Sequence, residues 1–235
     1  MVKRFALCLT LLLIPQAALA CRLALVLAID VSSSVDATED ALQRGGLARA
    51  LLDPDVQDAF FVSPEPVALM VFEWSGRYNQ VNLLDWTMIE NQADLLRASG
   101  RIGRSIRSHN DFPTALGYAL GYAATALDGG PDCQFSTIDM SGDGINNDGF
   151  GPAEAYAAFP FDGVTVNGLV VNAAEFTSEV DLIEFYETEV IRGPGAFVEI
   201  AQGFEDYARA IRRKLIRELS AQVIGAIDAG VADPG

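Results

Sequence analysis

The sequence predicts an α/β domain in which a central sheet is flanked by helices. Short apolar runs rich in β-branched residues alternate with amphipathic stretches, which is the pattern of a sheet covered by helices. The first run, residues 22–30, is apolar at nearly every position, as expected for a strand buried on both faces in a parallel sheet. Two later runs flank the short turn at residues 75–77 and predict a hairpin, which adds an antiparallel edge strand.

The strands are predicted from their apolar and β-branched content. After the first strand, the runs "PVALMVFEW" and "YNQVNLLDW" form the hairpin, "QFSTIDM" leads into a polar glycine-rich loop, and "VTVNGLVVN" is again apolar enough to be buried. The run "AFVEIA" ends the series. We therefore expect strands at 22–30, 66–74, 78–86, 134–140, 164–172 and 196–201.

The helices are predicted from periodicity and from their end signals. The stretch "PTALGYALGYAATAL" begins with a proline, which is favoured in a first helical turn, and its small residues allow close packing on a sheet. The last stretch, "FEDYARAIRRKLIREL", is amphipathic, and its basic residues Arg212, Arg213, Lys214 and Arg217 lie near its predicted C-terminal end, where cations favour the helix dipole. We expect helices at 36–52, 90–98, 113–127, 152–159, 178–191 and 204–219.

Residues 1–20 have the pattern of a secretory signal peptide. Lys3 and Arg4 precede an apolar run, and small residues follow up to Ala20. The run is too short to span a bilayer, and we expect no transmembrane segment elsewhere. The sequence therefore predicts an exported protein, periplasmic or secreted, with one domain at 21–220 and a C-terminal tail at 221–235.

The charge balance argues against nucleic acid as a partner. The chain has 32 acidic and 16 basic residues and a formal net charge of −16. An acidic surface repels phosphate backbones, so a nucleic-acid-binding function is disfavoured. An acidic balance also keeps a protein soluble, and that is the simpler explanation of it here.

Two cysteines, Cys21 and Cys133, remain once Cys8 is removed with the predicted signal peptide. In an oxidising compartment, a pair of cysteines predicts a disulfide. The alternative is that Cys21, directly after the cleavage point, is acylated as in a lipoprotein, although the preceding "ALA" lacks the leucine usual for that signal.

Polar side chains gather where predicted strands end. Asp30, Ser32 and Ser34 follow the first strand at alternate positions, Thr114 opens a helix after a polar loop, and Asp143 follows a later strand in "SGDG". Capping of the next helix explains one or two of these oxygens but not the alternation. In an open, mostly parallel sheet, ligands bind beyond the carboxyl ends of the strands, where such loops converge. Five hard oxygen donors without histidine or cysteine favour Mg²⁺, Mn²⁺ or Ca²⁺ over zinc.

These three segments resemble a known site. The pattern D-x-S-x-S, a threonine before "ALGYAL" and an aspartate in "SGDG" are similar to the metal-ion-dependent adhesion site (MIDAS) of von Willebrand factor A-type (vWA) domains. More narrowly, "CRLALVLAIDVSSSVD", "FEWSG" and "IDMSGDGINN" resemble an exported bacterial family labelled a domain of unknown function. The similarity extends over nearly the whole mature chain.

The resemblance implies a doubly wound, mostly parallel sheet of about six strands, with one antiparallel edge strand and helices on both faces. It also implies a Mg²⁺-type ion held by Asp30, Ser32, Ser34, Thr114 and Asp143, which an acidic side chain of a protein partner completes. Two departures affect the loop geometry: Ser33 stands where glycine is common, and "DFPT" replaces a glycine-rich approach to the threonine. If the first and fourth strands are parallel neighbours, Cys21 and Cys133 lie together at the opposite end of the sheet, within reach of a disulfide.

Two rival functions start from the same residues. Residues 139–150 match a calcium-binding loop at several positions, but position twelve is Phe150 where a bidentate acid is needed. A magnesium-dependent phosphohydrolase with Asp30 as nucleophile would need a second acid nearby and a lysine, yet position 32 is serine and the mature chain keeps one lysine, Lys214. The single histidine, His109, lies in a polar loop and is not expected to act as a base.

The sequence thus predicts an exported metal-dependent binding domain, not an enzyme. Four further residues are candidates for the rim of the site because they follow its strands: Asn146, Asn147, Glu73 and Trp74. For Glu73 and Trp74, filling the hairpin corner is the favoured alternative.

Overall fold

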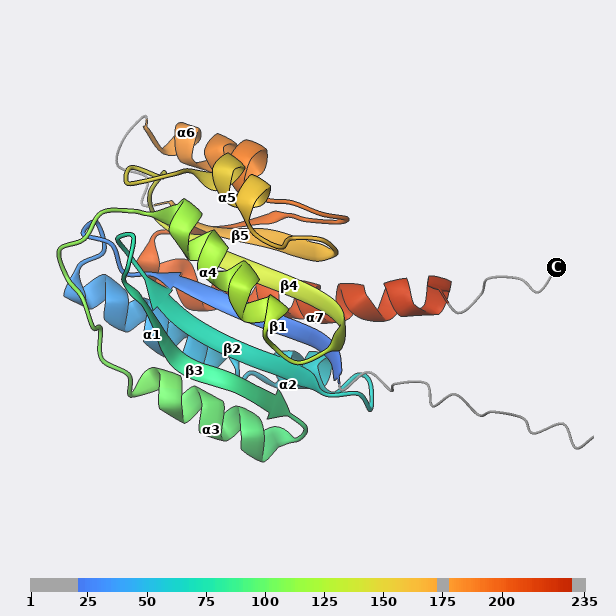
Figure 1. Cartoon of the computed structure of the whole chain (residues 1–235). Coiled ribbons are helices and arrows are strands. Elements are labelled where there is room, and N and C mark those ends of the chain that lie inside the picture. Colours follow the sequence, from blue (N-terminus) through green and yellow to red (C-terminus); the bar gives the residue numbers. More distant parts are fainter. Residues whose placement is uncertain (1–20, 173–177, 230–235) are drawn as a thin grey trace, which may run out of the picture.

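The computed structural model describes residues 21–172 and 178–229, and its centre is one six-stranded sheet (Figure 1). The strand order is β3-β2-β1-β4-β5-β6. The strands β1, β2, β4, β5 and β6 run parallel to one another, and β3 pairs antiparallel with β2 at one edge. This confirms the predicted fold class. The strands are β1 (Cys21–Asp30), β2 (Val67–Trp74), β3 (Gln80–Ile89), β4 (Cys133–Gly142), β5 (Val164–Asn172) and β6 (Val198–Gln202).

Helices cover both faces of the sheet (Figure 1). The helices α4 and α5 pack on one face, together with the segment that contains α6, and α1, α2, α3 and α7 lie on the other. The helices are α1 (Ala37–Ala50), α2 (Pro54–Phe60), α3 (Gln92–Gly103), α4 (Leu116–Asp128), α5 (Pro152–Ala158), α6 (Ser178–Phe185) and α7 (Tyr207–Ala229), with a π-helical turn η1 (Tyr186–Val190) and a 3-10 turn η2 (Phe204–Asp206).

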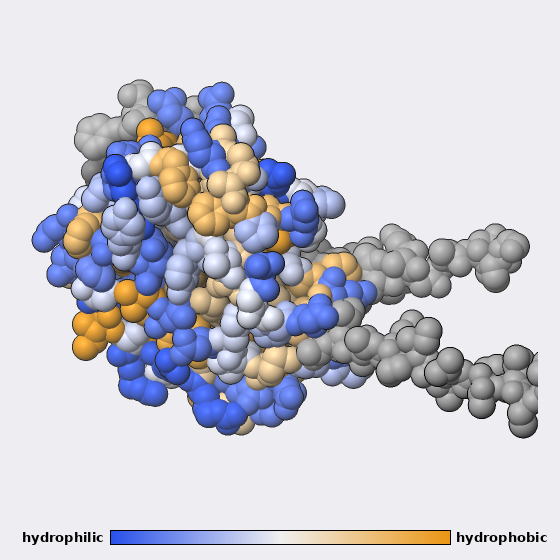
Figure 2. All heavy atoms as spheres, in the orientation of Figure 1, coloured by the Kyte–Doolittle hydropathy of each residue, from blue (hydrophilic) through white to orange (hydrophobic). Residues whose placement is uncertain are grey.

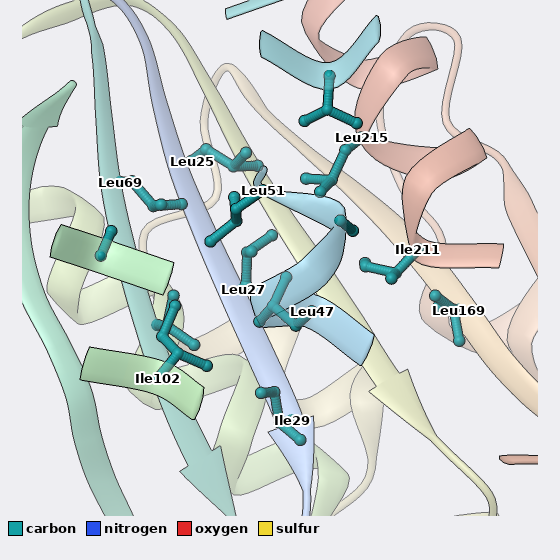
Figure 3. Close-up of a cluster of buried hydrophobic side chains, with 14 of the residues drawn as sticks. Leu25, Leu27, Ile29, Leu47, Leu51, Leu69, Ile102, Leu169, Ile211 and Leu215 are labelled. Atoms are coloured by element: carbon teal, nitrogen blue, oxygen red, sulfur yellow. The ribbon is translucent and has the colours of Figure 1, made fainter. Parts of the chain in front are cut away.

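The alternation of side chains along β1 divides the interior into two cores. Leu25, Leu27 and Ile29 point toward α1 and α7 (Figure 3), whereas Val26 and Ala28 face α4. All ten residues of β1 are buried, because the strand lies in the middle of the sheet with helices on both sides. The doubly apolar pattern of residues 22–30 therefore has the cause that the sequence indicated.

The structure differs from the predicted elements mainly in three places, and β3 and α3 also end later than predicted, at Ile89 and Gly103. The short helix α2 was not predicted, and the stretch 178–191 divides into α6 and η1. The last helix begins at Tyr207 and continues to Ala229, past the predicted end at Leu219. The basic residues 212–217 therefore lie in the first half of α7, and their predicted interaction with the helix C-terminus is wrong. The predicted signal peptide and residues 230–235 of the predicted tail lie outside the described residues.

The disulfide joins the two strands whose opposite ends carry the predicted site. Cys21 and Cys133 are directly paired in the parallel register of β1 and β4, and their Cα atoms are 4.5 Å apart. Because both residues begin their strands, the crosslink lies at the end of the sheet away from Asp30 and Asp143.

Across the described parts of the chain, no helix is both long and apolar enough to cross a bilayer. The face in Figure 2 is largely hydrophilic, with small apolar areas between the polar side chains.

Candidate metal centre

Asp30 ends β1 and is completely buried at the carboxyl edge of the sheet. The backbone N–H of Ser32 donates a hydrogen bond of 2.7 Å to Asp30 Oδ1, which curves the chain back over the strand end. The side-chain amide of Gln43, on α1, donates to the Asp30 carbonyl at 2.8 Å. The loop after β1 thus holds the Asp30 carboxylate, and α1 holds the Asp30 backbone carbonyl.

The five predicted residues meet at this edge. The hydroxyl oxygens of Ser32 and Ser34 are 3.1 Å apart, and Ser34 Oγ donates to Asp143 Oδ1 at 2.7 Å. Thr114 Oγ1 donates to Ser32 Oγ at 3.3 Å. Asp143 follows β4, the neighbour of β1, so the parallel register brings its carboxylate beside the serine loop.

Arg107 holds the serine loop in place, and sequence reasoning missed it. Its guanidinium donates hydrogen bonds to the carbonyls of Val31, Ser32 and Val35, at 2.6, 2.9 and 2.5 Å. Arg107 also donates a hydrogen bond of 2.6 Å to the backbone carbonyl of His109, in its own loop. Because the loop 31–35 has little regular structure of its own, these bonds satisfy carbonyls that a helix or a sheet would otherwise satisfy. An arginine in a polar loop gives no sequence signal for this role.

The buried ion pair of Arg44 and Glu73 holds the loop that carries Arg107. Arg44, on α1, contacts Glu73 at the end of β2 and donates to Asp40 at 2.8 Å. Glu73 in turn accepts a hydrogen bond of 2.9 Å from the backbone N–H of Ser108, next to Arg107. Glu73 thus connects α1 and β2 to the loop that carries Arg107.

Two of the four rim candidates are wrong. Glu73 is 1 % exposed and Trp74 is fully buried, so neither can line an exposed rim, and Glu73 has the supporting role just described. Asn147 does line the cavity, and its side chain accepts a hydrogen bond of 2.9 Å from the Thr114 N–H. Asn146 accepts from the Gly117 N–H at 3.3 Å, so both asparagines join the loop after β4 to the start of α4.

Burial and proximity of like charges destabilise the ionised carboxylates. Burial, reinforced by the negative charge of Asp143, raises the pKa of Asp30 to about 8. Burial also raises the pKa of Asp143. Among the described residues, Asp30 Oδ2 has no hydrogen-bond partner although it is buried. An unpaired buried carboxylate oxygen is costly, and a cation at this position would compensate it.

Gly142 leaves room for the carboxylate. A Cβ at this position would lie 2.9 Å from Asp30 Oδ2 and 2.7 Å from the Tyr186 hydroxyl, closer than real Cβ contacts come. Any side chain there would therefore displace Asp30 or Tyr186. The glycine of "SGDG" has a steric reason that the sequence motif alone does not reveal.

The site opens into a cavity of about 320 Å³. A carboxylate (Asp143), three hydroxyls nearby and the exposed side chains of Ile145 and Asp181 give it a mixed polar and apolar character. Its lining residues are Ser33, Ser34, Thr114, Asp143, Gly144, Ile145, Asn147, Asp181 and Leu182.

The donor set is rich in hydroxyls and poor in the ligands of transition metals. In the parts of the chain that the structure describes, no group of three or more histidine, cysteine, aspartate and glutamate side chains could hold a metal ion. The site instead combines two carboxylates with three hydroxyls, and its oxygen chemistry fits a hard divalent cation.

The rival calcium loop loses its first residue. Asp139, which would be the first ligand of a loop at 139–150, is 1 % exposed and forms an ion pair with Lys214 at 2.9 Å, under the sheet. It lies within β4, so its side chain belongs to the interior and not to the loop that follows.

Comparisons with known proteins give the family and the fold of the chain. A family model described as "Protein of unknown function (DUF1194)" matches residues 20–223. No curated protein matches the chain.

Among solved structures, the chain is similar to a von Willebrand factor type A protein from Catenulispora acidiphila, with 16% identity, a TM-score of 0.59, and coverage of 85% of this chain and 43% of the other. It is also similar to proximal thread matrix protein 1 of the mussel byssus with a zinc-occupied MIDAS motif, with 16% identity, a TM-score of 0.57, and coverage of 86% of this chain and 48% of the other. A third similar structure is the pilus adhesin SpaC of Lactobacillus rhamnosus GG, with 13% identity, a TM-score of 0.57, and coverage of 87% of this chain and 31% of the other. The chain spans less than half of each of these proteins, and at such identities the likeness shows the vWA fold.

Proposed function

Because the chain belongs to the family described as "Protein of unknown function (DUF1194)", whose description gives no activity, we propose a function from the geometry: the protein is an exported binding domain that recognises a protein partner through a divalent cation. The observation that carries the proposal is the convergence of Asp30, Ser32, Ser34, Thr114 and Asp143 at the mouth of a cavity, around a buried carboxylate oxygen to which no described residue donates a hydrogen bond.

The roles of the five residues follow from their positions. Ser32, Ser34 and Thr114 would offer hydroxyl oxygens to the ion, and Asp30 and Asp143 would bind it directly or through waters. Mg²⁺ is our first choice, with Mn²⁺ or Ca²⁺ as alternatives, because oxygen donors suit all three. The ion would neutralise two carboxylates whose charges otherwise repel.

The partner group is an acidic side chain. A hard divalent cation prefers oxygen ligands, so a carboxylate that reaches the ion through the open cavity is a fitting ligand for a coordination position that the five residues leave free. The zinc-occupied MIDAS of the byssus protein and the adhesin among the similar structures support a site of this kind. Export is supported by the signal-like residues 1–20 and by the disulfide, which persists in oxidising compartments.

Catalysis is not part of the proposal. A phosphohydrolase would need a free nucleophilic carboxylate and a cation for the phosphate, yet Asp30 Oδ1 already accepts the Ser32 N–H. Lys214, the lysine of the mature chain, is fully buried on the other side of β4. We expect the purified protein with Mg²⁺ to show no turnover of a phosphate ester.

The first test is ion-induced stabilisation. A ligand that binds the folded state at 100 times its dissociation constant stabilises the fold by about 2.7 kcal/mol, so Mg²⁺ should raise the unfolding temperature of the wild type. Asp30→Ala and Asp143→Ala should fold but lose this shift. Asp58→Ala, on exposed α2, is the matched control for nonspecific cation binding and should keep it. Equal shifts in all four proteins would refute the ion site.

The second test addresses the partner. Immobilised wild-type protein should retain a partner from the cell envelope in Mg²⁺ and release it in chelator, and Asp30→Ala should retain none. Retention that is insensitive to chelator would refute recognition through the ion.

A further inference from the structure

A second group of buried ionisable side chains lies between the sheet and α7, away from the ion site. Lys214, on α7, is fully buried, and its Nζ is 2.9 Å from Asp139 Oδ2 on β4. The same nitrogen donates a hydrogen bond of 2.6 Å to Glu218 Oε1, one helical turn further along. Asp139 and Glu218 are 1 % and 2 % exposed, so the lysine and both carboxylates share one dry space.

Neighbouring groups fix the orientation of this triad. Asn167, on β5, donates its side-chain N–H to Glu218 Oε1 at 2.7 Å and accepts the Phe197 N–H at 3.1 Å. The ring of Phe197 lies beside the lysine, with its centroid 5.2 Å from Nζ. An aromatic and aliphatic surrounding excludes water from the nitrogen.

As an ionic cluster, the triad is poorly compensated. One ammonium faces two carboxylates, which leaves a net negative charge in the interior, and such charges are expensive to bury. Lys214 Nζ is 2.9 Å from Asp139 Oδ2, but within the described chain neither Asp139 Oδ1 nor Glu218 Oε2 has a hydrogen-bond partner. A covalent link between Lys214 and Asp139 would remove one of the two ion pairs of Lys214 from the interior.

Such a link requires a neutral amine and a protonated acid. Transfer of one proton from Lys214 to Asp139 gives a neutral amine and a neutral carboxylic acid without altering the charge of the cluster. Burial raises the pKa of Asp139 to about 7, against the opposing effect of the Lys214 charge, so the protonated acid is present near neutral pH. The neutral amine is a nucleophile already in contact with the acid.

We propose that Lys214 and Asp139 form an intramolecular isopeptide bond, with Glu218 transferring the proton. The Lys214 nitrogen forms a bond to Asp139 Cγ while Glu218, as carboxylate, accepts the proton that the amine loses. Glu218 then returns this proton to the departing hydroxyl of the Asp139 acid, whose bond to Cγ breaks, and one water leaves. No oxidant or co-reactant is required, and Glu218 ends as it began.

The bond would give β4 a covalent link to the last helix. β4 is already joined to β1 by the disulfide at its first residue, so the central strand would be tied to both β1 and α7. Separation of α7 from the sheet would then require breaking a covalent bond. This inference is independent of the proposed ion site.

Peptide mass mapping of the wild type decides the matter. After reduction and alkylation, cleavage at arginine gives residues 108–192, which contain Asp139, and residues 214–217, which contain Lys214. We expect these two peptides joined, with a mass lower than their sum by the mass of one water, about 18 Da. Recovery of both peptides unlinked would overturn the proposal. So would a link from 214–217 to the peptide that begins at Glu218, because the acceptor would then be Glu218.

Variants test the role of Glu218. Glu218→Gln keeps the size of the side chain but removes the proton acceptor, so the peptides should be recovered unlinked, as they should from Asp139→Ala. Glu199→Gln, which alters a partly exposed carboxylate paired with Arg213, is the matched control and should remain linked. A linked Glu218→Gln protein would overturn the assigned role of Glu218.

Discussion

The disulfide between β1 and β4 should contribute about 5 kcal/mol to the free energy of unfolding. Cys21 and Cys133 are separated by 112 positions. In the chain-entropy estimate, a crosslink that closes a loop of this length removes roughly 16 cal/mol/K from the unfolded ensemble, or about 5 kcal/mol at 25 °C. The folded state adds little strain in this reasoning, because the strands are already paired in register at these two residues.

The perturbation is the double variant Cys21→Ala with Cys133→Ala, measured by urea unfolding at 25 °C. Its free energy of unfolding should be lower than that of the oxidised wild type by about 3 to 5 kcal/mol, the lower end allowing for residual structure in the unfolded chain. The m-value should rise, because the uncrosslinked chain exposes more surface when it unfolds. Reduced wild-type protein separates the crosslink from the small packing change at Cys21, which is fully buried.

A difference below about 1 kcal/mol between oxidised and reduced wild type would refute the entropic reasoning. The ion site provides an internal check. Because the crosslink is at the first residues of β1 and β4 and the site is at their last, Mg²⁺-induced stabilisation should be unchanged in the double variant. Loss of that stabilisation would mean that the two ends of the strands are not independent.

Two further predictions concern the ion site. Gly142→Ala should lower the free energy of unfolding by about 1 to 3 kcal/mol and weaken Mg²⁺-induced stabilisation, because the new methyl overlaps Asp30 Oδ2; calorimetry with and without Mg²⁺ measures both, and Gly129→Ala, where a Cβ meets only ordinary contacts, should do neither. In chelator, the wild type should lose stability relative to Asp30→Asn as pH rises from about 4 to about 8. The raised pKa of Asp30 means that the folded state holds this proton more tightly than the unfolded state, so ionisation above the unfolded pKa disfavours folding. If the difference between the urea midpoints of the wild type and Asp30→Asn does not change with pH, the prediction is wrong.

Much of the fold was predictable because each strand carries its environment in its pattern. The run 22–30 is apolar on both faces, and that pattern requires a central parallel strand with helices on both sides. The turn at 75–77 fixed the antiparallel edge. Given a mostly parallel sheet, the oxygens at 30–34 and at 143 follow neighbouring strands and must share one edge, so their meeting is a consequence of topology.

The supporting side chains could not be predicted, because their partners are far away in the sequence. The place of Glu73 at a strand end allowed either a rim position or a structural role at the hairpin corner, which was favoured, but it did not reveal the pairing with Arg44 and the backbone of Ser108. Arg107 gave no signal because its partners are backbone carbonyls, which every residue possesses. The partners of these side chains come from distant parts of the sequence, so the contacts become apparent only in the folded structure.

Lys214 shows the same limit in the helix that sequence reasoning described best. The amphipathic pattern correctly predicted a helix, yet it grouped Lys214 with three arginines as a basic surface near a helix end. In the structure, Lys214 lies on the buried face of α7. There it forms an ion pair with Asp139, whose side chain extends from β4 toward α7. β4 thus bears three constraints at Cys133, Asp139 and just past its end at Asp143. Because β4 is held by the disulfide at its first residue, by the Asp139–Lys214 ion pair and by pairing with β1 and β5, we expect ion binding to act on the loops 31–35 and 107–114 and to leave β4 in place.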